Sequence, residues 1–191
     1  MRRSISLLAA LIVAGLVAGC SSLPPLVTKS AIVPYGVDLS GNWQLRTAGQ
    51  AVDAQPGSAE ESIRIPAGGS RQGRWSRGSG DTGSAVRVFL EQGNDVKITQ
   101  TEYGMFMQFD RARVEEYRFG ENRIVSVGPI EAERVSGWDG ETFAVETRDE
   151  KGAMLYESWS LADGGKLLTR RISIVERGDE TLSTQQYFDR R

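Results

Sequence analysis

The sequence predicts an all-β protein, an antiparallel up-and-down meander of about eight to ten strands that closes into a barrel. From residue 85 onward, short runs rich in Val, Ile, Thr, Phe and Tyr recur about every 10 to 13 residues. Pairs such as Gly93-Asn94, Asp139-Gly140 and Asp163-Gly164 separate many of these runs and supply the positive φ angles of tight hairpins. No segment after residue 40 is long and periodic enough to predict an α-helix. Closure is favoured because it removes exposed sheet edges, whereas the alternative, a β-sandwich, normally needs longer connections.

The chain begins with a predicted signal peptide over residues 1–19, which we expect to be helical. Arg2 and Arg3 give a positive start, and Leu7 to Val17 form an apolar run. Small residues and the only cysteine, Cys20, follow. This order is typical of a secretory signal with its cleavage site. The apolar run is too short for a transmembrane span, which needs roughly 20 apolar residues. A core helix with a buried cysteine is the alternative interpretation.

The tetrapeptide Val17-Ala18-Gly19-Cys20 resembles the lipobox of bacterial lipoproteins. The resemblance implies acylation of the Cys20 sulfur, including palmitate, cleavage before Cys20 and acylation of the new amino group. Two or more acyl chains anchor a protein stably to a bilayer. Residue 21 is Ser rather than Asp, which in such lipoproteins implies passage to the outer membrane, facing the periplasm.

Two segments are predicted to lack regular structure. Residues 20–39 contain three prolines and little charge, so we expect a lipidated extended tether. Residues 40–191 then form the barrel domain. Within it, residues 48–84 are a Gly-, Ser- and Arg-rich insertion, interrupted at most by a short strand at 62–65.

Strands are predicted in the following order along the barrel domain. The runs are 42–46, 85–92, 95–102, 105–110, 114–119, 123–128, 131–138, 142–148, 154–161, 167–176 and 181–188. A single helical turn around 110–116 is the one expected interruption.

Ser40-Gly41-Asn42-Trp43 opens the first strand and resembles the Gly-x-Trp signature of lipocalins and other calycins. In that family the Trp plugs one end of an eight-stranded barrel, and an Arg on the last strand packs across it. The resemblance therefore implies a lipocalin-like barrel in which Arg170 stacks on Trp43. Strand alternation agrees, because Arg170 shares a face with Ile172 and Ile174.

Several large side chains are candidates for lining the barrel interior. An eight-stranded barrel either holds one small molecule or is filled by its own side chains. Both alternatives use the same residues, which are candidates for binding an apolar ligand. They are Trp43, Tyr103, Met107, Phe109, Tyr156 and Trp159.

The carboxylates give no catalytic assignment. Glu131 and Glu133 share one face of a strand. Glu157 alternates in phase with Leu155 and Trp159, which predicts an inward position, where an inward Arg such as Arg170 would neutralise it. The expected role of these groups is structural.

The amino-acid composition excludes several classes of protein function. The chain has no histidine, one cysteine and a net charge of −2. These counts remove His-dependent and Cys-dependent catalysis, the usual zinc sites and disulfides, so we expect no enzyme, metal or cofactor. Catalysis by carboxylates, Lys or Tyr and a hard cation on oxygen ligands are the alternatives that the composition leaves open. The mild acidity gives no argument for nucleic acid. Arg71, Arg74 and Arg77 surround Trp75 in the insertion, and they are candidates for contacting an anionic surface such as lipid A.

Two functions fit these observations. In the first, an outer-membrane lipoprotein binds a small apolar or amphipathic ligand inside its barrel. In the second, the barrel is filled, and the protein is an envelope interaction or structural module that acts on a protein, peptidoglycan or lipopolysaccharide through its surface.

Overall fold

A computed structural model describes residues 23–46 and 84–191, and these residues form an all-β fold. The predicted signal peptide, Cys20 and the insertion at 48–83 lie outside the described residues. Within the described ranges, no helix is long and apolar enough to cross a membrane. The strands are β1 (Gly41–Leu45), β2 (Asp95–Gln100), β3 (Gly104–Phe109), β4 (Arg113–Arg118), β5 (Asn122–Val127), β6 (Ile130–Asp139), β7 (Thr142–Asp149), β8 (Met154–Ala162), β9 (Leu167–Glu176) and β10 (Asp179–Arg190).

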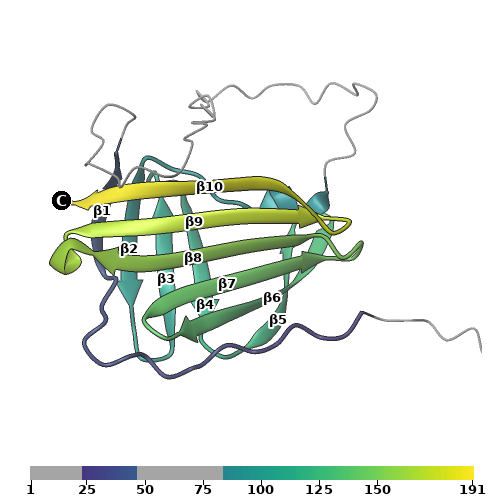
Figure 1. Ribbon diagram of the computed structural model, residues 1–191, viewed down its shortest axis with the longest axis horizontal. Helices are drawn as coiled ribbons and strands as arrows, with labels where there is room; N and C mark the ends of the chain where they lie inside the picture. Colours follow the sequence, from purple (N-terminus) through teal and green to yellow (C-terminus); the bar gives the residue numbers. More distant parts are fainter. Residues whose placement is uncertain (1–22, 47–83) are drawn as a thin grey trace, which may run out of the picture.

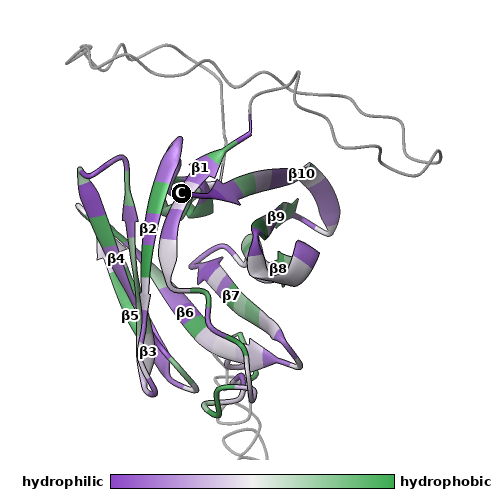
Figure 2. Cartoon of the chain, turned by 90° about the vertical axis from the view of Figure 1, so that its left-hand side faces the viewer, coloured by the Kyte–Doolittle hydropathy of each residue, from purple (hydrophilic) through white to green (hydrophobic). Residues whose placement is uncertain are grey.

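All ten strands belong to one antiparallel sheet in the order β4-β3-β2-β1-β10-β9-β8-β7-β6-β5 (Figure 1). The predicted pairing of the first strand with a C-terminal strand is confirmed, since β1 pairs with both β10 and β2. Viewed from the end, the sheet curls so that β2–β4 face β8–β10 (Figure 2). The ring is not completed, because β4 and β5 are the two edges and no ladder joins them in the part of the chain that the structure describes. The predicted closed barrel is therefore an open, curled half-barrel.

The two sheet edges approach each other at one end. The Gly120 amide, in the β4–β5 turn, donates to the Ser136 carbonyl of β6, 2.8 Å away. The Ser136 hydroxyl donates to the Arg118 carbonyl of β4, also over 2.8 Å. These bonds tie β4 to β6 past the end of β5, so the half-barrel is held together without a β4–β5 ladder.

The segment 85–92, predicted to be a strand, instead begins with the 3₁₀ helix η1 (Ala85–Phe89). Val86 and Phe89 are its buried residues, and their spacing of three places them on one face of a 3₁₀ turn. They pack with β8 and β9 residues in a cluster that fills one end of the half-barrel. The predicted helical turn at 110–116 is also wrong. Residues 110–112 are a hairpin turn, and β4 starts at Arg113.

Residues 23–39, here called the N-terminal strap, lie along the sheet instead of forming a free tether (Figure 1, purple). The Leu26 amide donates to Glu133 Oε1 at 2.9 Å, and Lys29 forms an ion pair with Glu146. Ser30 and Trp138 exchange two backbone hydrogen bonds of 3.2 and 2.9 Å. Gly137 permits this approach, because a Cβ there would lie 2.5 Å from the Ser30 carbonyl oxygen. The strap therefore crosses β6 and β7.

The strap then enters the core. Leu39 is completely buried, and Val33 and Val37 pack against the same cluster. The Leu39 amide donates to Gln100 Oε1 at 2.9 Å, while Gln100 Nε2 donates to the Val37 carbonyl. The strap thus covers the end of the half-barrel opposite η1, and both ends of the interior are filled by chain from outside the main meander.

Candidate functional site: the filled interior

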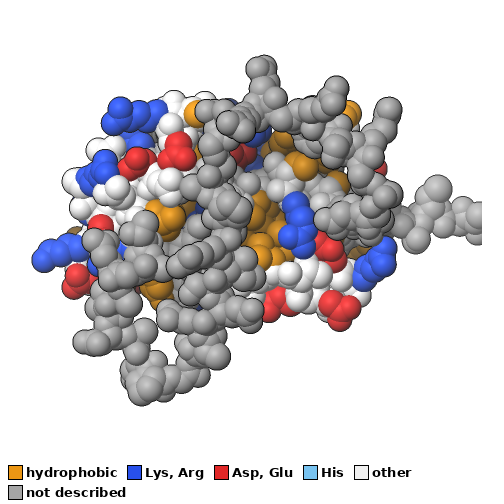
Figure 3. All heavy atoms as spheres, turned by 90° about the horizontal axis from the view of Figure 1, so that it is seen from above, with side chains coloured by type: hydrophobic (Ala, Val, Ile, Leu, Met, Phe, Trp, Pro, Cys, Tyr) orange, Lys and Arg blue, Asp and Glu red, His pale blue; other side chains and the backbone are white. Residues whose placement is uncertain are grey.

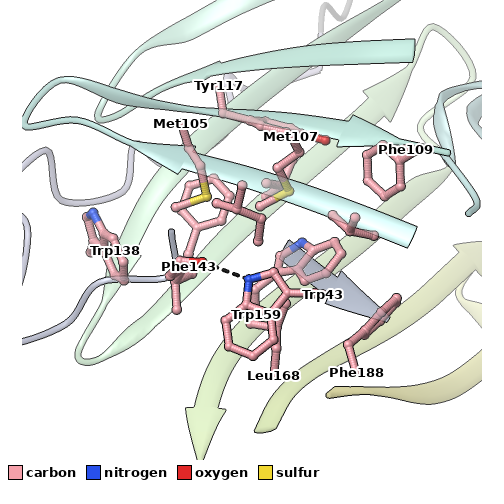
Figure 4. Packing of buried hydrophobic residues seen from close by; sticks show 14 of the residues in the cluster. Trp43, Met105, Met107, Phe109, Tyr117, Trp138, Phe143, Trp159, Leu168 and Phe188 are labelled. Carbon is pink, nitrogen blue, oxygen red and sulfur yellow. Dashed lines mark hydrogen bonds between the residues drawn. The ribbon is translucent and has the colours of Figure 1, made fainter. Parts of the chain in front are cut away.

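The interior of the half-barrel is packed with aromatic and sulfur-containing side chains from both walls (Figure 4). Phe109 and Trp159 lie with ring centroids 6.3 Å apart, and Trp159 and Phe188 lie 6.0 Å apart. At the other end, Phe143 lies 5.8 Å from Trp138. These tilted and edge-on arrangements are those that aromatic rings prefer in cores. The interior therefore contains side chains that contact one another across the sheet.

Four of the six predicted cavity residues lie in this cluster. Trp43, Met107, Phe109 and Trp159 are all buried. The other two are corrected, because Tyr103 is 75% exposed and Tyr156 is 37% exposed. Tyr103 lies in the β2–β3 turn, and Tyr156 alternates with the inward side chains of β8, so both face outward. The alternation signal for Tyr156 was already present in the sequence.

Trp43 is held by its neighbours on three sides. Its Nε1–H donates to the Leu39 carbonyl at 3.0 Å, and the Arg190 guanidinium lies 4.4 Å from its ring centroid. Arg190 also donates to the Ser40 carbonyl at 3.0 Å. Gly41 has φ +152°, and a Cβ there would lie 3.1 Å from Arg190 Nη1. The glycine of the Gly-x-Trp sequence therefore makes room for the arginine that covers Trp43.

The arginine stacked on Trp43 is Arg190, so the expectation that Arg170 takes this place is wrong. Arg170 instead lies over Trp159, 4.7 Å from the ring centroid, and over Phe109 at 5.5 Å. The pairing register explains the difference, because Arg170 is directly opposite Trp159 on β8, and Arg190 is directly opposite Trp43 on β1.

Arg170 forms a buried ion pair with Glu157, as the phase of Glu157 with Leu155 and Trp159 predicted. Both side chains are almost fully buried, at 1% and 2% exposure. Arg170 Nε donates to Glu157 Oε2 at 3.1 Å, and Nη2 makes a second, closer contact to the same oxygen. Nη2 also donates to the Glu91 carbonyl at 2.9 Å. The guanidinium is thus neutralised and hydrogen-bonded inside the core, which a buried charge requires.

A second arginine, Arg134 of β6, reaches across the open side of the sheet. Its Nη1 lies 3.2 Å from Glu115 Oε2 of β4, and its Nε donates to Thr147 Oγ1 at 3.0 Å. The guanidinium also lies over the rings of Tyr117 and Phe89, at 5.5 and 5.7 Å. Sequence reasoning missed Arg134, although it alternates in phase with Trp138 along β6. This ion pair crosses from β6 to β4, where no backbone ladder exists.

These charges perturb the neighbouring titratable groups. Burial raises the pKa of the Glu91 carboxyl; Arg113, 2.9 Å away, opposes the shift, and the carboxylates of Glu115 and Glu157 add to it. Burial likewise raises the pKa of the Tyr117 phenol far above its usual value, and the Glu157 carboxylate raises it further. The phenol therefore stays neutral within its pocket.

The carboxylate of Glu133 on β6 has a structural role. Glu133 contacts Arg148, accepts from Asn122 at 2.6 Å and accepts from the Leu26 amide. Burial would raise the pKa of Glu133, but these three donors outweigh it and lower the pKa. Glu131 is exposed on the same face. Glu133 therefore holds the N-terminal strap against the sheet.

The two best-formed hollows of the described residues open to the outer surface. One, of about 260 Å³, is lined by side chains of the strap, β5, β6 and the end of β7, including Leu23 and Ile124. The other, of about 210 Å³, lies over β2–β4 beside Phe106 and Val114. Neither is lined by residues of the aromatic cluster in the interior, although the buried Ala132 borders the first. Arg71, Arg74 and Arg77 lie outside the described residues, as does Cys20.

No family model and no curated protein matches this chain. Among solved structures, the chain is similar to the crystal structure of secretory abundant heat soluble protein 4 from Ramazzottius varieornatus. The two share 12% identity and a TM-score of 0.39, over 51% of this chain and 68% of that chain. A likeness of this size supports no conclusion about function.

Proposed function

We propose that this protein is a lipid-anchored envelope module with a filled half-barrel, which acts through its outer surface on a protein, peptidoglycan or lipopolysaccharide. The observation that most directly supports the proposal is the packed interior of the half-barrel. Aromatic side chains from facing strands contact one another there, and the two inward arginines are neutralised by glutamates of the same chain. A protein that carries apolar molecules would need an empty cavity in the interior of the half-barrel.

The volumes of the hollows support the same choice. Ligand pockets usually begin at about 300 Å³ and are enclosed by apolar side chains. The two hollows of about 260 and 210 Å³ are smaller, and both lie on the outside of the sheet. An anionic amphipathic ligand that paired with Arg170 would also have to displace Glu157, which would leave a buried carboxylate unpaired.

The anchor is proposed from the sequence of the first twenty residues. Arg2, Arg3, the apolar run and the small residues before Cys20 fit a signal peptide followed by lipidation. Ser21 favours the outer membrane, with the domain facing the periplasm. Cys20→Ser should abolish labelling by palmitate and leave uncleaved precursor. Palmitate on the substituted protein would contradict the anchor.

The surface is suited to contact several classes of envelope partner. On the face seen from above in Figure 3, acidic and basic side chains are interspersed around the periphery, and neither sign forms one large patch. Such a surface favours specific docking over general attraction to a polyanion. Arg71, Arg74 and Arg77 remain the proposed contacts to anionic headgroups.

Native mass spectrometry of the protein purified from membranes tests the filled interior. The expected mass is that of the acylated polypeptide alone. A lipocalin that is known to carry its ligand, released from the same detergent, serves as the positive control. A stoichiometric small apolar molecule that stays with the folded protein and leaves on unfolding would overturn the proposal and restore the ligand carrier.

A further inference from the structure

We infer that the outer face of β5 and β6, together with the β7–β8 turn, is the side of the domain that lies against the lipid bilayer. The inference rests on the proposed lipid anchor and adds an orientation to it. It follows from the docking of the N-terminal strap, which sets where the chain leaves the domain.

Because the strap is docked on the sheet, only a short length of free chain separates the lipid anchor from the domain. Leu26 is fixed by its amide bond to Glu133, and Ser30 by its two backbone bonds to Trp138. Leu26 lies only six residue steps beyond Cys20, and an extended chain spans at most about 3.6 Å per step, or about 22 Å in all. A free tether over 20–39 would have allowed more than three times this distance.

The place where the chain leaves the domain toward the lipid anchor is also fixed. Leu23 lines the 260 Å³ hollow with Ile124 and Ala132. The Leu23 Cδ1 atom lies 3.5 Å from the position that a Cβ on Gly152 would occupy, so it contacts the β7–β8 turn. The three residue steps from Leu23 to Cys20 span at most about 11 Å. The acyl chains therefore enter the bilayer beside this hollow.

The exposed side chains at this place suit a membrane interface. Leu23 is 50% exposed, Val27 78% and Ile124 63%. Aliphatic side chains that protrude beside a lipid anchor gain from insertion at the headgroup boundary, whereas they have no such partner in water. Glu131 and Glu150 also line the hollow and are exposed, so the face is amphipathic, with apolar side chains beside charged ones.

Quenching by nitroxide-labelled lipids tests this orientation in the full, lipidated chain. Because acylation consumes the only cysteine, Ile124→Cys introduces a single free thiol for a fluorophore. Tyr187→Cys is the matched control, since Tyr187 is 39% exposed on the outer side of β10. Five inter-strand steps separate β10 from β5, about 24 Å along the sheet. In phosphatidylethanolamine–phosphatidylglycerol vesicles, we expect headgroup nitroxides to quench position 124 at least about threefold more than position 187.

A spacer variant isolates the role of the strap. Twelve Gly-Ser residues inserted between Ser22 and Leu23 leave the fold unchanged but restore slack, so the difference between the two positions should disappear. The mass of the N-terminal peptide is measured in every sample. Acylated protein with equal quenching at 124 and 187 overturns the orientation alone. A peptide without acyl chains overturns the anchor and the orientation with it.

Discussion

At the scale of single residues, an arginine covers each of two interior tryptophans, Trp43 and Trp159. Arg190 lies over Trp43 and Arg170 over Trp159, in each case from the directly opposite position on the neighbouring strand. A cation over an indole contributes about 0.5–2 kcal/mol. The two pairs join β1 to β10 and β8 to β9, so the same contact stabilises the sheet at two places.

Trp43→Ala should lower the free energy of unfolding by about 3–5 kcal/mol, because it removes a fully buried indole and leaves a cavity under Arg190. Urea unfolding followed by circular dichroism measures the loss. Tyr35→Ala is the control, since the Tyr35 side chain is fully exposed and its removal should cost less than about 0.5 kcal/mol. Equal losses for the two variants would show that Trp43 is not a core residue in solution.

Glu157→Gln should cost about 3–5 kcal/mol, because Arg170 would remain charged in the core without a counter-ion. Replacing both partners by apolar residues, Glu157→Leu with Arg170→Met, should cost less than the single change. The exposed pair Arg118–Glu116 is the matched control, and its disruption should cost less than about 1 kcal/mol. A double variant that is as unstable as the sum of its singles would contradict the pairing.

At the scale of elements, the N-terminal strap is an extra layer on the outside of the sheet. It packs on β6 and β7 through Glu133, Glu146 and Trp138. Its last residue, Leu39, lies in the core. Sequence reasoning predicted an extended tether for this segment. It could not predict the docking, because the partners of the strap lie about 100 residues away in the chain.

The strap should respond to pH through Glu133, whose pKa is lowered in the folded state. Its carboxylate therefore stabilises the fold above the unfolded pKa, and this contribution is lost as the pH falls through the lower folded pKa. Glu133→Gln should cost about 1.5–3 kcal/mol at pH 7, as for hydrogen bonds to a charged group. Below the folded pKa, the variant and the natural protein should converge.

Urea unfolding at a series of pH values measures this convergence. Glu131→Gln is the matched control, because Glu131 lies exposed on the same face of β6. Its effect should stay within about 0.5 kcal/mol at every pH. A loss for Glu133→Gln that does not change between pH 7 and strongly acidic solution would mean that the carboxylate charge does not hold the strap.

At the scale of the whole molecule, the half-barrel has two edges, and it joins them with side chains instead of a ladder. Arg134 pairs with Glu115 across the open side, and the Ser136 hydroxyl binds the Arg118 carbonyl. Together with η1 at one end and the strap at the other, these contacts enclose the packed interior. The fold therefore stays compact without complete closure.

Because the sheet is open between β4 and β5, we expect its backbone amides to differ in their protection from hydrogen exchange. β4 and β5 have a neighbouring strand on one side only, whereas β9 and β10 are paired on both sides. Native-state hydrogen exchange followed by mass spectrometry should show amides of β4 and β5 exchanging about tenfold faster, or more, than those of β9 and β10. Equal protection of all four strands would indicate a closed barrel in solution.

The sequence by itself determined the antiparallel meander, the pairing of its first and last strands and the inward position of Glu157. These features depend on residue alternation and turn residues, which are local properties of the chain. Ten of the eleven predicted strands are present. The segment 85–92 failed because Val86 and Phe89 fit a 3₁₀ turn as well as a strand, and only packing against β8 and β9 selects the turn.

Only the tertiary structure decided which arginine covers Trp43, whether the sheet closes and where residues 23–39 lie. Each of these depends on the register and curvature of strands far apart in sequence. Arg170 meets Trp159 because β9 pairs with β8, whereas β10 lies between β9 and β1 and so places Arg190 opposite Trp43. The filled interior is likewise a sum of side-chain volumes across facing strands, and alternation alone assigns residues to the inside without showing whether space remains there.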